Sequence, residues 1–327
     1  MNIKKEYIIL IAIIMSLSLY LILRSPDRTR YHLPKLPDVL RFDISKIEIS
    51  KPDTSIAMNI KDDIWHIAPQ GYPANTGKIK NLLDIVEKLP LTALVSESKN
   101  YLRYDLSREK KITVKAWAGN TSRREVDIGK SAATFQHTYV TLPNDPNVYH
   151  ARGNFRSKFD QSVDTLRDKL VLSVNVGDLH EIRIIEKGQT TVIRKRKSEP
   201  EKSDSKDKKP KTQWETKTGQ AIDSGKLEAF LAFFSRLYGD KYIDQKQKSD
   251  FQDPVYQINF IEKKEHNLSF FDKIDPKAGN YPGISSANPY PFLLATSQVD
   301  RIKEAAREML PKSETATSKG TSTDAAE

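Results

Sequence analysis

The chain has 327 residues, no cysteine, and a formal net charge of +10 at pH 7 from 53 Lys and Arg against 43 Asp and Glu. This length allows one large domain or two modest ones, and the lack of cysteine excludes disulfide frameworks, cysteine-ligated zinc or iron–sulfur centres and cysteine nucleophiles. With 38% apolar and 29% charged residues, the composition is that of a globular protein, neither collagenous nor polytopic.

Residues 7–23 are an uncharged, apolar stretch that follows Lys4 and Lys5 and ends at Arg24. As a helix rising 1.5 Å per residue, the stretch covers about 25 Å, the lower end of what crosses a hydrocarbon core. No small-residue cleavage pattern follows it, which disfavours a removable signal peptide, and no amphipathic stripe favours a buried core helix. We therefore expect residues 1–30 to comprise a cytoplasmic tip, a single transmembrane anchor and a juxtamembrane segment.

The orientation of this span is ambiguous from the flanking charges. Two lysines precede the span, while Arg24, Arg28 and Arg30 follow it, so the positive-inside rule does not favour export of the large C-terminal part. A very short N-terminal tail followed at once by the span is nevertheless typical of exported single-span proteins. We expect the N-terminus in the cytoplasm and the bulk of the chain outside it.

Two passages of the remaining chain are alike, which predicts two tandem, structurally similar repeats at residues 31–160 and 178–310, joined by a connecting helix within residues 161–177. An apolar stripe in a predicted helix at 78–89 recurs at 226–238 with the i, i+3, i+4, i+7 spacing of one helix face. The matched pairs, each 148 residues apart, are Ile79 and Leu227, Leu82 and Phe230, Leu83 and Leu231, Val86 and Phe234, and Leu89 and Leu237.

The match extends beyond these helices. Suitable N-caps precede both helices, Asn75 or Thr76 in one and Asp223 or Ser224 in the other. Two tryptophans, Trp65 and Trp214, stand before the helices and are interpreted as core residues, with ligand stacking as the alternative. Two acids, Asp105 and Asp253, are interpreted as turn or cap residues leading into a strand.

Each repeat is predicted to be a mostly antiparallel sheet with one packed helix, an α+β arrangement. A further helix at 297–310 is expected to close the second repeat, with Val299, Ile302, Ala306 and Met309 as its inner face. Alternating apolar residues predict strands at 44–50, 112–117, 124–128, 137–142, 181–186, 190–194, 256–261 and 267–271.

Two low-complexity segments are expected to be disordered. Residues 195–212 are charged and form an insertion in the second repeat, and residues 194–211 alone carry a net charge of +5. Neither this insertion nor the tail at 311–327 has the apolar residues needed to offset the entropy of ordering.

No motif of known chemistry is complete, so no catalytic, cofactor-binding or metal-binding residue is predicted, no cofactor is expected, and the protein is not expected to be an enzyme. The Gly129-Lys130-Ser131 sequence ends like a phosphate-binding loop, but Arg124 stands where that loop needs glycine. It is therefore interpreted as a strand-end turn.

Histidines and acids are similarly inconclusive. The pair His137 and His150 flanks a predicted hairpin and could bind a metal, but surface histidines or histidines with satisfied hydrogen bonds are far more common. Asp160, Asp164 and Asp168 repeat at helical spacing and are interpreted as a solvated helix face near Arg167 and Lys169. The basic balance is partly confined to the insertion, and nothing resembles a nucleic-acid module, so no nucleic-acid partner is expected.

Several passages together resemble a bacterial membrane-anchored family known as a domain of unknown function, of the DUF 4340 type. They are Ile47-x-Ile49, Asp62-x-x-Trp65, Leu82-Leu83, Tyr101-x-x-Tyr104-Asp105-Leu106, Val126-Asp127-Ile128-Gly129, Thr138-Tyr139-Val140, Val148-Tyr149 and Leu166-Arg167-Asp168-Lys169. Members are often encoded beside ABC-transporter components of the gliding-motility type. The resemblance implies a single-pass protein of the bacterial inner membrane with a periplasmic bulk, and it supplies no catalytic residue.

The leading hypothesis is a membrane-anchored extracytoplasmic interaction or scaffold protein that serves as an accessory of an ABC-type envelope transport complex. The alternative is a protein that binds an envelope glycan or lipid, with Trp117, Tyr281 and Tyr290 as candidate contacts. A cell-wall hydrolase is the third hypothesis, because carboxylate pairs can be distant in sequence.

Overall fold

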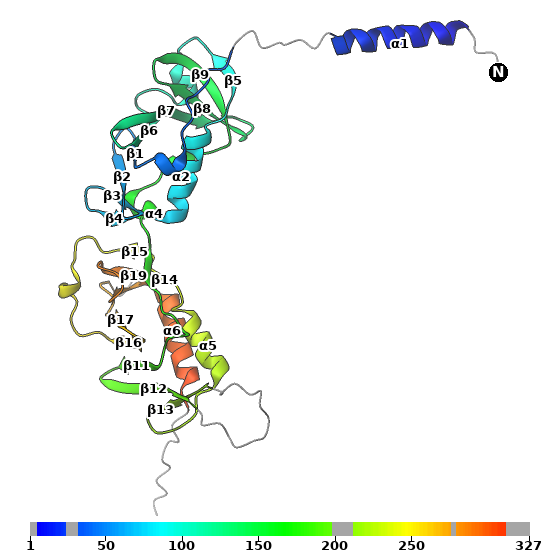
Figure 1. Ribbon diagram of the computed structural model, residues 1–327. Coiled ribbons are helices and arrows are strands. Elements are labelled where there is room, and N and C mark those ends of the chain that lie inside the picture. Colours follow the sequence, from blue (N-terminus) through cyan, green and yellow to red (C-terminus); the bar gives the residue numbers. More distant parts are fainter. Residues whose placement is uncertain (1–4, 24–31, 198–211, 276–278, 312–327) are drawn as a thin grey trace, which may run out of the picture. The chain divides into compact units, whose positions relative to one another are not determined.

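The chain divides into two compact units, Met1–Leu166 and Arg167–Glu327, each with its own antiparallel sheet (Figure 1). This computed structural model describes residues 5–23, 32–197, 212–275 and 279–311. Antiparallel sheets accompanied by a few helices are an α+β architecture, so the predicted fold class is confirmed. The boundary between the units lies between Leu166 and Arg167.

The first unit has a sheet of nine strands among the described residues, in the order β4-β3-β2-β1-β6-β7-β8-β9-β5. The strands are β1 Lys46–Ser50, β2 Ser55–Lys61, β3 Ile64–Ile67, β4 Tyr72–Pro73, β5 Leu91–Ser96, β6 Ile112–Ala118, β7 Thr121–Ser131, β8 His137–Leu142 and β9 Asp145–Arg152. The helices are α1 Lys5–Leu23, η1 Arg41–Asp43, α2 Thr76–Lys88, η2 Tyr101–Tyr104, α3 Arg156–Phe159 and α4 Val163–Leu166.

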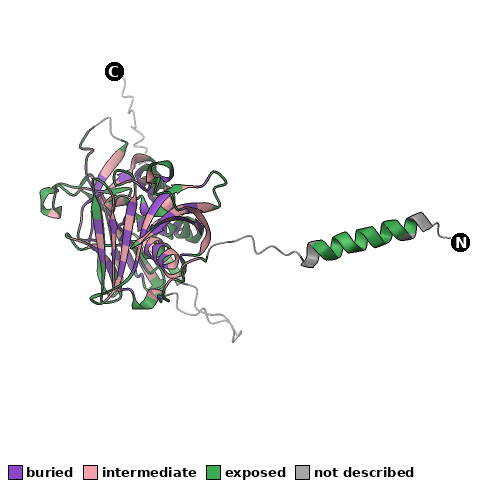
Figure 2. Cartoon of the chain, turned by 90° about the horizontal axis from the view of Figure 1, so that it is seen from above, coloured by how far each residue is buried: buried purple, intermediate pink, exposed green. Residues whose placement is uncertain are grey.

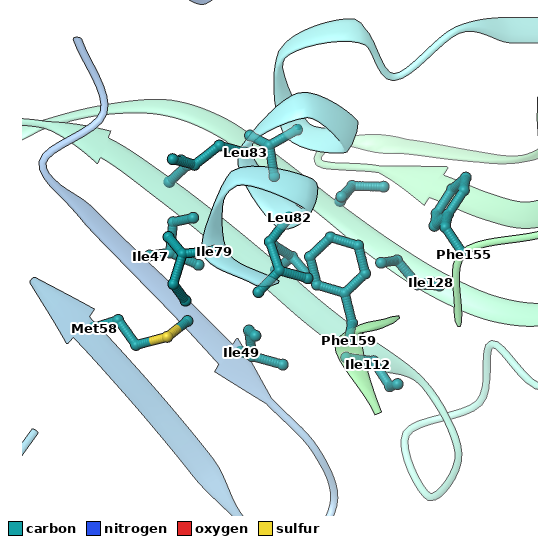
Figure 3. Packing of buried hydrophobic residues seen from close by; sticks show 14 of the residues in the cluster. Ile47, Ile49, Met58, Ile79, Leu82, Leu83, Ile112, Ile128, Phe155 and Phe159 are labelled. Atoms are coloured by element: carbon teal, nitrogen blue, oxygen red, sulfur yellow. The ribbon is translucent and has the colours of Figure 1, made fainter. Parts of the chain in front are cut away.

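Helix α2 forms because an amphipathic stripe follows a good N-cap. The side chain of Asn75 accepts a hydrogen bond from the backbone N–H of Lys78 at 3.0 Å, which satisfies one of the free donors at the helix start. The apolar face then packs on one face of the sheet, where Ile79 and Leu82 meet Ile47 of β1 and its neighbours (Figure 3). Each such side chain stabilises the fold by about 1.5–3 kcal/mol when fully buried.

The second unit has an eight-stranded sheet over its described residues, in the order β13-β12-β11-β16-β17-β18-β19-β15, and a separate pair of β10 with β14. The strands are β10 Leu170–Leu172, β11 Glu181–Glu186, β12 Gln189–Lys197, β13 Thr212–Thr216, β14 Leu237–Tyr238, β15 Lys241–Tyr242, β16 Tyr256–Ile261, β17 Glu265–Phe270, β18 Asn280–Ser285 and β19 Phe292–Ala295. The helices are α5 Ser224–Ala232, η3 Lys248–Asp250 and α6 Thr296–Met309.

The two sheets have the same strand order when β4 is set aside. Read from one edge, β3-β2-β1-β6-β7-β8-β9-β5 in the first unit corresponds strand by strand to β13-β12-β11-β16-β17-β18-β19-β15 in the second. Along the chain, helix α2 comes after β3 and β4, and helix α5 comes after β13. The two helices are capped alike, because the side chain of Asp223 accepts a hydrogen bond from the N–H of Lys226 at 2.9 Å, as that of Asn75 does from Lys78.

Both tryptophans before the helices are core residues, as interpreted. The side chain of Trp65 on β3 is buried in the core of the first unit, and Trp214 on β13 is half-buried against the core of the second. The predicted inner face of the closing helix is also confirmed, because Val299, Ile302, Ala306 and Met309 of α6 are all buried.

Two predicted helices are wrong in extent. The helix expected at 226–238 ends at Ala232, and Leu237 continues as strand β14, where it pairs with Leu172 of β10. The connecting helix expected within residues 161–177 has one turn, α4, followed by strand β10. In both places, pairing between β10 and β14 joins segments about 65 residues apart, a contact that no local periodicity encodes.

The prediction that three acidic residues share one solvent-exposed helix face is wrong for the same reason. Asp160 is the C-cap of α3, Asp164 lies in α4, and Asp168 follows the end of α4. The three residues therefore lie in successive short elements and cannot share the face of one helix. Arg167, expected in solvent beside them, is buried instead.

The bounds predicted for the disordered insertion, residues 195–212, are wrong at both ends. Strand β12 continues to Lys197 and β13 begins at Thr212, and the two strands pair from Ile193↔Thr216 to Lys197↔Thr212. The remaining insertion, residues 198–211, and the tail from 312 onward lie outside the described residues.

Candidate functional site

The described residues of helix α1 are exposed along the helix (Figure 2), and most of them are apolar. Side chains are described for Tyr7 and residues 9–20, of which Ser16 and Ser18 alone are clearly polar. The large apolar ones are between 51% and 64% exposed, although an apolar side chain normally seeks cover from water. Over the part of the chain that the structure describes, no helix is both long and apolar enough to cross a membrane.

A row of four rings lies on the face of the first sheet opposite α2. The ring centroids of Tyr104 and Tyr139 are 4.8 Å apart, those of Tyr139 and His150 4.8 Å, and those of His150 and His137 5.1 Å. The predicted hairpin thus brings the two histidines together. Burial, with the charge of His137, lowers the pKa of His150, so His150 favours the neutral form.

This row does not make a metal centre by itself. No group of three or more His, Asp or Glu side chains suited to a metal ion occurs in residues 5–23, 32–197, 212–275 and 279–311. The Nε2 atom of His150 is buried without a hydrogen-bond partner among the described residues. The neutral imidazole is therefore held chiefly by stacking and by its place in the sheet.

The second unit contains a buried arginine enclosed by aromatic rings. The guanidinium of Arg167 lies 3.9 Å from the ring centroid of Tyr242 and 5.1 Å from that of Tyr290, and its Nη1 donates to Asp244 at 2.6 Å. The hydroxyl of Tyr242 donates to the carbonyl of Asp168 at 2.7 Å. These contacts fix the start of β10 against β15 and the β18–β19 turn, so the cluster is a structural one.

An open cavity of about 510 Å³ in the first unit is lined by Lys111 and Thr113, among other residues, and both of these side chains bond to Asp127, which does not itself line the cavity. Thr113 donates to Asp127 Oδ1 at 2.6 Å, and Lys111 Nζ lies 2.7 Å from Asp127 Oδ2. Both carboxylate oxygens are thus engaged by neighbours on the same sheet. This arrangement is a surface cross-strand network and leaves the carboxylate poorly placed to act as a base.

The aromatic residues proposed for ligand contacts are engaged within their own units. Trp117 has Lys46 Nζ at 4.5 Å from its ring centroid, and Tyr290 lies against Arg167. Tyr281 packs against the second core with Lys273 and Lys303 within 5.2 Å of its ring. Their observed role is packing and cation–π contact.

Gly129-Lys130-Ser131, interpreted as a strand-end turn, are the last residues of strand β7 itself, so the strand end is confirmed and a turn at these residues is wrong. Gly129 has a packing role, because a Cβ atom there would lie 2.2 Å from the carbonyl oxygen of Tyr104. Its lack of a side chain allows η2 and the following residues to lie directly on the sheet.

The burial of two arginines, Arg124 and Arg167, was not predicted from the sequence. Arg124 has the same strand parity as Val126 and Ile128, so alternation alone could have placed it on the buried face of β7. Arg167 gave no such signal, because it was assigned to a helix that does not form. Its burial depends on residues more than 70 positions away.

The family to which the chain belongs follows from comparison with known proteins. No curated protein and no solved structure matches the chain. The model of the family described as "Domain of unknown function (DUF4340)" matches residues 65–273, which run from β3 through α2 and the first sheet to just beyond β17 in the second unit. Since this match covers well over half of the chain, the protein belongs to the DUF4340 family.

Proposed function

We propose that this protein is a membrane-anchored interaction protein, with α1 as the anchor and the two units as a scaffold outside the cytoplasm. The exposed apolar surface of α1 carries the proposal, because no described part of the chain covers it. A surface that is apolar on all sides of a helix favours a lipid or protein environment over water. The charges that flank residues 7–23 mark the limits of the anchor in the sequence.

We further infer that the units are tandem copies of one fold. Their shared strand order, their matched helix caps at Asn75 and Asp223, and the constant spacing of the two apolar helix stripes support this inference. Two copies on one stalk would offer two related surfaces to a larger complex. Such an arrangement suits simultaneous contacts better than a single active site does.

The proposed partner is an ABC-type transport complex in a bacterial inner membrane. This choice rests on the resemblance set out from the sequence, since family members are often encoded beside such transporter components. The polar clusters of the described residues support binding over catalysis. In two of them the charged groups are paired with neighbours in their own unit, Asp127 with Lys111 and Arg167 with Asp244.

The anchor is tested by substituting charges in α1. The double variant Ile11→Lys/Ile14→Lys places two charges in the middle of the helix, each of which costs about 2.5–3.5 kcal/mol at the centre of a membrane span. We expect the wild-type protein to stay in the membrane fraction after alkaline carbonate extraction and the variant to be released. The control Ile64→Lys/Ile274→Lys alters two exposed apolar residues outside α1 and should stay with the membrane.

The orientation and the partner need separate measurements. A reporter fused after residue 310 that is active only outside the cytoplasm should be active, and an intracellular one should be silent. Purification of the full chain in mild detergent should recover transporter components. Retention of the α1 variant in the membrane, a cytoplasmic reporter signal, or recovery of no membrane protein would each contradict the corresponding part of the proposal.

A further inference from the structure

Arg124 on β7 is a buried cation with unmet hydrogen-bonding capacity. Its side chain points to the core face of the first sheet, and the residue is only 6% exposed. Nη2 donates to the carbonyl of Pro37 at 3.0 Å and, more weakly, to that of Glu87 at 3.4 Å. Nε and Nη1 have no partner among the described residues. Leaving a buried charged donor unpaired costs more than the 1–3 kcal/mol of a neutral one.

The segment beside Arg124, residues 33–38, makes no backbone–backbone hydrogen bond with another described residue. We call it the strap. Leu33 and Leu36 pack against the core of the first unit, but Pro34 and Pro37 have no backbone N–H to donate to a neighbouring strand. In the second unit the segment before the first sheet strand is β10, which pairs with β14.

Cavities lie on both sides of the strap, and Arg124 lines each of them. The smaller, of about 240 Å³, adjoins the C-terminal end of α2 and contains Asp38 and Lys88. The negative end of a helix dipole and the Asp38 carboxylate disfavour an anion in this cavity. The charge of Asp38 in fact acts on Arg124, opposing the lowering of its pKa by burial.

The larger cavity, of about 430 Å³, has an excess of uncommitted positive charge. Lys35 and Arg123 line it, both exposed, and neither forms an ion pair with a described residue. Of the two carboxylates at its wall, Glu125 has a cationic partner of its own and Asp145 keeps its negative charge, against the three cationic groups Lys35, Arg123 and Arg124. Glu125 pairs with Lys115 at 3.1 Å, and Asp145 accepts from the hydroxyl of Tyr149 at 2.7 Å.

The remaining wall of this cavity is apolar. Pro34, Leu36 and Pro37 of the strap face Leu142 and Pro143 at the turn between β8 and β9. Leu40 and Phe42, which follow the strap, are 59% and 83% exposed. The site therefore combines three cationic groups with adjacent apolar surface, as the head group and upper acyl region of an anionic amphiphile require.

We propose that the larger cavity binds the phosphate of an anionic membrane lipid, held by Lys35, Arg123 and Arg124, with the strap moving aside so that the phosphate reaches Nε and Nη1 of Arg124. A lipid is favoured over a soluble phosphate because only residues 24–32 separate the strap from α1, and nine residues span at most ~32 Å. This inference rests on the proposed membrane anchoring. The bound lipid would fix the first unit against the bilayer surface.

The test uses the full chain in a neutral detergent. Native mass spectrometry measures binding of phosphatidylglycerol and of zwitterionic phosphatidylcholine, and inorganic phosphate is added as a competitor. We expect at least tenfold tighter binding of phosphatidylglycerol, with partial displacement by millimolar phosphate. The variant Lys35→Glu/Arg123→Glu, altered only at exposed positions, should lose most of this preference.

The matched control, Arg103→Glu/Lys130→Glu, makes the same change in net charge at exposed positions outside the cavity and should keep the preference. Arg124→Gln should lose it as well, provided that its circular dichroism spectrum is native. Equal binding of both lipids, or equal losses in the test and control variants, would overturn the site. Binding of phosphate without binding of lipid would overturn the choice of ligand.

The outcome for the site is separable from that for the anchor. If the wild-type chain resists carbonate extraction but shows no lipid preference, the inference fails while the proposed anchoring stands. If the chain is released by carbonate yet still prefers the anionic lipid, the site stands and the anchor fails.

Discussion

Asp105 and Asp253 have the same left-handed backbone conformation, with φ of 55° and 54°, although they lie 148 residues apart. Asp105 ends the 3₁₀ turn η2, and Asp253 follows the 3₁₀ turn η3. Both were interpreted as turn residues before a strand, and this interpretation is confirmed by their conformation. Aspartate tolerates this region better than most residues because its short side chain can bond to the local backbone.

Alanine at either position should therefore destabilise its own unit. We expect Asp105→Ala and Asp253→Ala each to lower the free energy of unfolding by about 1 kcal/mol, because Ala is less favourable than Asp in the left-handed conformation; at Asp105 the change also removes the 3.3 Å contact with Lys110. Asn should be tolerated at Asp253. Hydrogen exchange of amides in β7 and in β17 reports the two units separately. Equal protection in the Ala and Asn variants would contradict the strain argument.

Gly129 should be intolerant of a side chain for a different reason. A Cβ atom would lie 2.2 Å from the backbone oxygen of Tyr104 and 2.9 Å from Leu106 Cγ, and backbone cannot yield as a flexible side chain can. We expect Gly129→Ala to destabilise the first unit by about 2–3 kcal/mol, within the range for overpacking.

The control for this substitution is Gly279→Ala. No atom lies within 4 Å of a Cβ built at Gly279, so the unfolding free energy should change by less than about 0.5 kcal/mol. Urea denaturation of the full chain, followed by hydrogen exchange at β6 and β7, distinguishes the two. A native-like Gly129→Ala protein would show that η2 does not lie on the sheet as described.

The contacts of Arg167 predict that a positive charge at this position is not enough to keep the second unit stable without the planar guanidinium. The side chain of Arg167 is 1% exposed, whereas that of its partner Asp244 is 51% exposed. Removing the guanidinium leaves a carboxylate that water can solvate, so the loss comes mainly from the ring contacts and one charged hydrogen bond. We expect Arg167→Met to lower the stability of the second unit by about 2–4 kcal/mol.

Arg167→Lys should cost nearly as much, because an ammonium group cannot stack as a planar guanidinium does between Tyr242 and Tyr290. The control Arg236→Met removes an exposed cation 5.5 Å from the ring of Tyr238 and should cost under about 0.5 kcal/mol. Protection of the β10 and β14 amides is the measurement. Full rescue by Lys would mean that the cluster acts through charge only.

The periodicity of apolar residues was sufficient to predict those strands and helices that are buried on one face. Strands at 137–142, 181–186 and 256–261 were predicted to the residue, because alternation and turn residues bound them. The helices predicted at 78–89 and 297–310 are confirmed within two residues at each end.

The periodicity did not predict elements that depend on pairing between distant segments of the chain. Leu237 continues the apolar stripe of α5 in sequence, yet it is buried just as well in strand β14, so periodicity could not distinguish the two. A hairpin flanked by His137 and His150 was predicted, but its second strand, β9, was assigned neither bounds nor its place between β8 and β5. The cavities beside Arg124 depend on where the strap crosses the sheet, which a pattern of single residues does not encode.

His150 makes the stability of the first unit depend on pH. Burial and the neighbouring charge of His137 lower its pKa in the folded protein below the unfolded value of about 6.5. As the pH falls from about 7.5 towards 5, the unfolded chain therefore binds a proton that the folded chain resists, and the free energy of unfolding falls. This contribution is fully present above the unfolded pKa and is lost on acidification.

His150→Phe should weaken that dependence, because an apolar ring keeps the stacking between Tyr139 and His137 and removes the titrating group. The variant should lose less stability than the wild type between pH 7.5 and 5.5, as measured by urea unfolding and by exchange of β8 and β9 amides. His180→Gln, an exposed histidine of the second unit, is the control and should keep the wild-type slope for β8 and β9. An unchanged slope in His150→Phe would assign the acid sensitivity to another group, because the only charge removed is the one at His150.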